Sequence, residues 1–110
     1  MKVAVMGTGH VGLVTCVAFA SIGHDVTGTD VDAEKIEALR RGVSPFYEPG
    51  LDDALVREMA SGRLSFTLEA SEALRGAEAV FIVSNRATTL GLVADLERRG
   101  IPAFGPIWDS

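Results

Sequence analysis

A short run near the N-terminus reads Lys2-Val3-Ala4-Val5-Met6-Gly7-Thr8-Gly9-His10-Val11-Gly12. Its first five residues predict a short buried strand, and glycines follow in the spacing G-x-G-x-x-G where a helix would begin. In that spacing Gly7 permits a tight turn, Gly9 lets the backbone approach a diphosphate, and Gly12 allows the helix to pack closely on the strand. Free amides in the first helical turn then hold the anion. The predicted dinucleotide-binding residues of this turn are Gly7, Thr8, Gly9, His10, Val11 and Gly12.

Asp30 supplies the second half of the pattern. It stands at the predicted end of the next strand, 18 residues after Gly12. A carboxylate there accepts hydrogen bonds from the hydroxyls of an adenosine ribose, and it repels a 2′-phosphate. We therefore expect NAD rather than NADP as the cofactor. The alternative interpretation is a plain tight turn beside an ordinary surface aspartate.

Strand and helix patterns alternate along the chain, which predicts an α/β fold with helices covering a parallel sheet. Asp32 is placed to cap the second helix and Gly42 to end it. The apolar residues whose spacing indicates the first helix are Val11, Val14, Ala18 and Ile22. The strands are predicted at 2–6, 25–30, 64–67, 79–83 and 101–104, and the helices at 11–22, 33–41, 51–61, 71–75 and 89–99. We expect a single domain over residues 1–110, a Rossmann-like, doubly wound sheet of about five strands in the order 3-2-1-4-5.

The composition is that of a globular protein, since 47% of the 110 residues are hydrophobic and 23% are charged. The net charge of −5 argues against nucleic acid as a partner, because binding a phosphate backbone needs clustered cations. A single cysteine, Cys16, excludes an internal disulfide and a structural zinc site. Glycines interrupt the apolar N-terminal stretch, and no apolar run approaches the length of a membrane span. We therefore expect a cytoplasmic protein that does not enter a membrane.

Several side chains outside the dinucleotide pattern receive ordinary interpretations. Cys16 is expected to be a small buried apolar residue rather than a reactive thiol. His10 and His24 have no carboxylate or cysteine at ligand spacing, so we expect no metal site. Glu48 lies in a proline-rich loop and is expected to be solvated. Trp108 is a candidate for packing against a second copy of the chain.

Residues 1 to about 82 resemble the N-terminal NAD-binding domain of the UDP-glucose/GDP-mannose dehydrogenase family. Enzymes of this family oxidise the C6 alcohol of a nucleotide sugar to a carboxylate in two NAD-dependent steps. The resemblance implies that the glycines hold the diphosphate, that Asp30 holds the adenosine ribose, and that Lys35 lies near that ribose. Its Tyr-Glu-Pro-Gly-Leu block separates this family from other dinucleotide-binding domains. Beyond the glycine-rich run, the resemblance rests on Gly23-His24-Asp25-Val26, Asp30-Val31-Asp32, Lys35, Ser44-Pro45-Phe46-Tyr47-Glu48-Pro49-Gly50-Leu51 and Gly62-Arg63-Leu64-Ser65-Phe66-Thr67.

The family pattern breaks after Phe81-Ile82. Members of the family continue into a Val-Gly-Thr-Pro loop that contacts cofactor and substrate, whereas this chain reads Val83-Ser84-Asn85-Arg86-Ala87. Residues 83–110 are weakly similar to segments of glycinamide ribonucleotide formyltransferase and of glycinamide ribonucleotide synthetase. These similarities suggest a recombined or engineered chain.

Three hypotheses on function are open at this point. The chain is an NAD-binding module with no catalytic residue of its own, since the family places its nucleophilic cysteine and catalytic lysine in a later domain. Alternatively, it is the cofactor half of a nucleotide-sugar 6-dehydrogenase that works with a separate substrate domain or by self-association. The third hypothesis is a recombined Rossmann-like chimera without catalytic activity.

Overall fold

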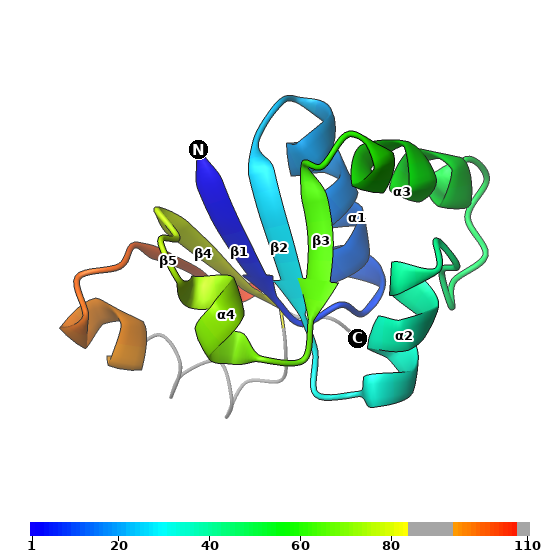
Figure 1. The fold of residues 1–110 in the computed structure, drawn as a ribbon. Helices are drawn as coiled ribbons and strands as arrows, with labels where there is room; N and C mark the ends of the chain where they lie inside the picture. Colours follow the sequence, from blue (N-terminus) through cyan, green and yellow to red (C-terminus); the bar gives the residue numbers. More distant parts are fainter. Residues whose placement is uncertain (84–93, 108–110) are drawn as a thin grey trace.

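Five parallel strands form one sheet in the order β3-β2-β1-β4-β5 (Figure 1). This computed structural model describes residues 1–83 and 94–107. Every neighbouring pair of strands is parallel, so the predicted α/β class and the predicted strand order are confirmed. The strands are β1 (Lys2–Met6), β2 (Asp25–Thr29), β3 (Leu64–Thr67), β4 (Ala79–Val83) and β5 (Ala103–Ile107).

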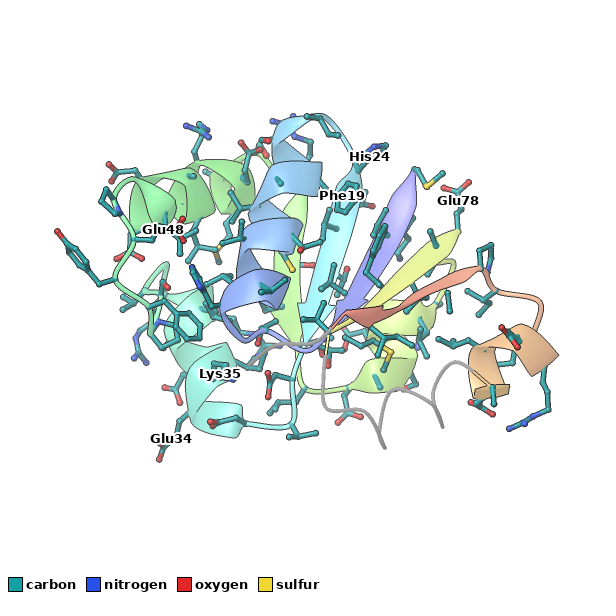
Figure 2. The ribbon with its side chains drawn as sticks, turned by 180° about the vertical axis from the view of Figure 1, so that it is seen from behind. Phe19, His24, Glu34, Lys35, Glu48 and Glu78 are labelled. Carbon is teal, nitrogen blue, oxygen red and sulfur yellow. The ribbon has the colours of Figure 1, made fainter. Side chains whose placement is uncertain are left out.

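Helices cover the two faces of the sheet unequally. The helices α1 (His10–Ser21), α2 (Ala33–Arg40) and α3 (Leu51–Ala60) pack on one face, as Figure 2 shows from their side. The short helix α4 (Ala70–Leu74) lies on the other face, together with a helical turn at 94–98. Crossover connections of this kind place the carboxyl ends of all strands at one edge, where doubly wound sheets bind ligands.

Strand β1 contributes to a hydrophobic core on each face, because successive side chains of a strand point to opposite sides. Val3 and Val5 are buried in the core beneath α1, α2 and α3. Ala4 and Met6 are buried in the second core, where they meet Leu96 of the helical turn. Burial on both faces explains why this central strand is apolar at consecutive positions.

The cap predicted for α2 is confirmed. The Asp32 carboxylate accepts hydrogen bonds from the backbone amides of Glu34 and Lys35, at 3.0 and 3.2 Å. Gly42 follows the helix with φ of +79°, a left-handed conformation that glycine adopts readily. These two residues set the length of α2 and thereby the position of Lys35.

Helix α1 forms as predicted, but the apolar stripe that indicated it is the exposed side of the helix. Val11 and Val14 are each 37% exposed, and Ile22 is 70% exposed. Apolar residues surround α1 on nearly all sides, so periodicity alone does not select the face that packs on the sheet. That face is selected by close approach to Gly28, where an added Cβ would lie 3.0 Å from Cys16 Sγ. The buried residues of α1 are Gly12, Leu13, Cys16, Val17 and Ala20.

The last strand begins two residues later than predicted, at Ala103 instead of Ile101. The amides of Gly100 and Ile101 donate to the carbonyls of Glu97 and Leu96, at 3.0 and 3.1 Å, and so close the helical turn at 94–98. Residues 100 and 101 therefore belong to the end of that turn. The described residues do not include the first part of the predicted helix, 89–93, nor Ser84-Asn85-Arg86 and Trp108.

Candidate functional site

The turn after β1 accepts only glycine at its first position. Gly7 has φ of +106°, and a Cβ added to it would lie 1.9 Å from the carbonyl oxygen of Val83. The Gly7 amide donates to the carbonyl of Thr29 at 2.8 Å, which ties the turn to the end of β2. The turn is thus held against two neighbouring strands at the carboxyl edge of the sheet.

Gly12 brings the start of α1 onto this turn. A Cβ at residue 12 would lie 1.9 Å from the carbonyl oxygen of Gly7 and 3.6 Å from the Val83 side chain. Backbone atoms of a tight turn have no room to retreat from such a contact. The roles that the sequence assigned to Gly7 and Gly12, a tight turn and close packing of the helix, agree with these distances.

The N-terminus of α1 differs from those of α2, α3 and α4. Its N-cap is Gly9, which supplies no side-chain cap, and its first turn contains no acidic residue. In contrast, α2 is capped by Asp32, and α3 and α4 carry acidic residues in their first turns. Uncapped amides and the positive end of the helix dipole favour an anion. Among these four helices, α1 therefore fits a diphosphate best.

Asp30 immediately follows β2 and is bonded to the glycine-rich turn. Its Oδ2 accepts hydrogen bonds from the backbone amide of Thr8 at 2.9 Å and from the Thr8 hydroxyl at 3.0 Å. The Lys35 ammonium donates to the same oxygen at 3.2 Å, and the Asp32 amide donates to Oδ1 at 3.0 Å. The structure thus brings the predicted residues Thr8, Asp30 and Lys35 together.

These bonds leave room on one side of the carboxylate. A carboxylate has about four lone-pair sites, two on each oxygen, and Oδ2 already receives three donors. Oδ1 receives only the Asp32 amide within the described part of the chain. Oδ1 of Asp30 can therefore accept one hydroxyl group from a ligand without displacing a protein donor.

The chain matches the model of the UDP-glucose/GDP-mannose dehydrogenase family, NAD binding domain, over residues 1–97. The chain belongs to this family. The match extends past residue 82. It therefore enters residues 83–110, the segment whose sequence is weakly similar to glycinamide ribonucleotide formyltransferase and synthetase. The match therefore covers β4 and residues 94–97 of the helical turn.

Curated relatives and solved structures agree with this assignment. UDP-glucose 6-dehydrogenase YwqF of Bacillus subtilis is 46% identical over 82 residues, which are 74% of this chain and 19% of that protein. A UDP-glucose dehydrogenase structure from Pyrobaculum islandicum is 48% identical with a TM-score of 0.71, over 74% of this chain and 19% of that one. GDP-mannose dehydrogenase from Pseudomonas aeruginosa is 33% identical with a TM-score of 0.74, over 89% of this chain and 24% of that one. The chain thus spans about a fifth of the length of these relatives.

Two features of the site were not apparent in the sequence. Thr8 was predicted only as a residue of the turn, yet its hydroxyl bonds to Asp30. Glu48 is exposed, as expected, but its Oε2 also lies 2.7 Å from His10 Nε2, a contact that the sequence did not predict. Thirty-eight residues separate His10 and Glu48, so no local pattern could have signalled the contact.

The described residues contain no group of three or more side chains suited to hold a metal ion. None of the helices in the same residues is long and apolar enough to cross a membrane.

The charge of Asp30 makes the stability of the NAD-binding domain depend on pH. Partial burial alone would raise the pKa of Asp30, but the donors on Thr8, Asp32 and Lys35 outweigh it and hold the pKa below its ordinary value of 3.8. The folded state thus gains stability from the ionised group above about pH 4, and this gain disappears as the pH falls through the lowered pKa. We expect the difference in unfolding free energy between the wild type and Asp30→Asn to be constant near pH 6 and to shrink below about pH 4. Urea unfolding at several pH values measures it, and a difference that grows in acid would contradict the assignment.

Cys16 is expected to be chemically inert in the folded domain. Its side chain is fully buried, and burial raises the pKa of the thiol to about 12. Since only the thiolate attacks disulfide reagents, we expect no reaction with Ellman's reagent under native conditions. One equivalent should react after denaturation, because the chain has a single cysteine. Rapid labelling of the native protein would show that α1 opens readily.

Proposed function

We propose that the chain binds NAD through the glycine-rich turn, the first turn of α1 and Asp30. The observation that carries the proposal is the hydrogen-bonded Asp30 carboxylate, which Thr8 ties to the uncapped start of α1. The residues of the turn, from Gly7 to Gly12, would hold the diphosphate through backbone amides. Asp30 would hold the adenosine ribose through Oδ1, with Lys35 beside it. Bound NAD would supply a hydride acceptor.

The charges around Asp30 support NAD over NADP. The Lys35 ammonium lies 3.2 Å from Oδ2, so the aspartate already neutralises the nearest cation. A 2′-phosphate would meet the negative charge of the Asp30 carboxylate, and the Lys35 ammonium beside it is already paired. We expect calorimetric titration to show at least about tenfold tighter binding of NAD than of NADP. Equal affinity, or no binding of either dinucleotide, would refute the proposal.

The relatives support a role in oxidation of a nucleotide sugar. Their names describe dehydrogenases of UDP-glucose and GDP-mannose. We propose that this chain is the cofactor-binding part of such a 6-dehydrogenase in the cytoplasm, and that a substrate domain or a second copy of the chain completes the site. Co-expression with the substrate domain of a relative should then produce NADH from NAD and UDP-glucose. Absence of turnover despite NAD binding would reduce the function to that of a binding module.

A recombined chain without activity is the second candidate. The observation in its favour is that the alignment with YwqF covers 82 of the 110 residues. Strand β5, from the remaining segment, nonetheless pairs with β4 and completes the sheet. This candidate predicts cooperative unfolding that NAD does not shift, whereas a ligand of the native state raises Tm by mass action.

A further inference from the structure

Glu48 reaches the first residue of α1 from a distant loop. Its Oε2 lies 2.7 Å from His10 Nε2, and the two side chains are 43% and 53% exposed. An ionised carboxylate only accepts hydrogen bonds, so Nε2 of His10 carries the proton and donates it. The contact therefore selects the tautomer and the orientation of an imidazole at the anion-binding end of α1.

The loop that carries Glu48, residues 43–50, is held by hydrogen bonds to α3 and by hydrogen bonds within the loop. The Ser44 amide donates to Asp52 Oδ1 at 3.0 Å, in the first turn of α3. The Ser44 hydroxyl accepts from the Phe46 amide at 3.0 Å and donates to the Phe46 carbonyl at 3.1 Å. The Ser44 end of the loop is thus held to α3, and at the other end the Leu51 amide of α3 donates to the Glu48 carbonyl at 3.1 Å.

The 43–50 loop meets α1 at His10. The ring centroids of Phe46 and His10 are 5.4 Å apart, which places the imidazole against an aromatic ring as well as a carboxylate. Further along α1, a hollow of about 220 Å³ separates Val14 from Pro49. Because packing along the helix is incomplete, the contacts of His10 brace the loop against the start of α1.

We propose that Glu48 is a positioning residue for the dinucleotide and acts through His10, an inference that rests on the proposed function. Held by Glu48 and Phe46, the imidazole cannot turn across the free amides of α1, and the 43–50 loop stays beside the diphosphate. Without the bond between Glu48 and His10, the imidazole and the 43–50 loop would both have to be ordered when the dinucleotide binds. Lys35, the partner of Asp30, lies on α2, and Glu48 lies on the loop before α3 (Figure 2), so the adenosine contacts do not depend on Glu48.

Removal of the Glu48 side chain tests this role. We expect Glu48→Ala to weaken NAD binding about fivefold, since ordering one side chain or loop contact on binding has an effect of that size. Binding of adenosine monophosphate, followed by NMR titration, should change by less than about twofold, because the monophosphate lacks the second phosphate and the nicotinamide ribose. Glu48→Gln keeps a hydrogen-bonding partner for His10 and should bind NAD within about twofold of the wild type.

Glu37→Ala is the matched control. Glu37 is an exposed glutamate on α2, and its Oε1 pairs with Arg41 at 3.1 Å. The substitution should leave NAD affinity unchanged. If the wild type fails to bind NAD, the proposed function itself is refuted. If the wild type binds NAD and Glu48→Ala binds it equally well, or loses both ligands by the same factor, the positioning role is overturned. Weak binding by Glu48→Gln would likewise overturn it.

The imidazole provides a readout that does not depend on the ligand. Long-range ¹⁵N spectra at about pH 9 distinguish the two tautomers of the imidazole. We expect the Nε2–H form of His10 to predominate in the wild type and a mixture in Glu48→Ala. Unchanged spectra in Glu48→Ala would show that the carboxylate does not orient the ring.

Discussion

Replacing Gly12 with alanine is expected to destabilise the domain strongly. The new Cβ would lie 1.9 Å from the Gly7 carbonyl oxygen, and both partners belong to backbone that is fixed by β1 and α1. Relief requires α1 to move away from the sheet and from the core beneath it. We expect a loss of about 3 kcal/mol or more in the free energy of unfolding. Thermal unfolding should report this loss as a Tm lower by about 12 °C or more.

Gly23→Ala separates the clash from the general effect of removing a glycine. Gly23 has φ of +103°, but no atom lies within 4 Å of its added Cβ. Its substitution should therefore lose only about 1–2 kcal/mol, from the strain of a left-handed backbone. If Gly12→Ala unfolds at the wild-type temperature, α1 does not lie in contact with the glycine-rich turn. The dinucleotide site would then lack the support that its geometry needs.

Replacing Asp30 with alanine is expected to weaken NAD binding and to remove the preference against NADP. The variant loses the carboxylate that we propose accepts a ribose hydroxyl, and a hydrogen bond to a charged group contributes about 1.5–3 kcal/mol. NAD affinity should therefore fall about tenfold to a hundredfold. Lys35 would lose its 3.2 Å partner and become free to pair with a 2′-phosphate, so NADP should bind at least as tightly as NAD. Calorimetric titration of both dinucleotides gives the ratio directly.

Asp30→Asn and Asp25→Asn complete this experiment. The asparagine at residue 30 retains most of the shape of the side chain while removing the charge that repels a phosphate. Asp25 is an exposed aspartate at the opposite end of β2, so its substitution should alter neither affinity. An Asp30→Asn protein that still discriminates against NADP would show that the selection comes from other residues.

Much of the fold could be predicted because its signals are local. The apolar run of β1, the glycines after it and the acid after β2 occur in the order that a parallel crossover unit requires. Right-handed connections then limit the strand order to few choices, and the predicted order is the observed one. Asp32 was recognised as a cap for the same reason, since its acceptor lies within three residues of its donors.

What local patterns did not decide are choices between equivalent local patterns. Val14 and Cys16 are both apolar residues of α1, and a helix that is apolar on nearly all sides does not reveal which of them faces the sheet. The answer depends on Gly28, which lies on another strand and leaves space for Cys16. Likewise, the start of β5 depends on whether Ile101 closes the preceding helical turn.

By itself, the sequence determined that this chain has a glycine-rich turn between a buried strand and a helix, with an acid after the second strand. These features follow from backbone geometry and spacing, which are properties of neighbouring residues. Only the tertiary structure decided that three donors on Thr8 and Lys35 hold Oδ2 of Asp30 and that Glu48 holds His10. Such contacts join residues that are 5 to 38 positions apart, and they form only after the sheet and its helices have brought these residues within hydrogen-bonding distance.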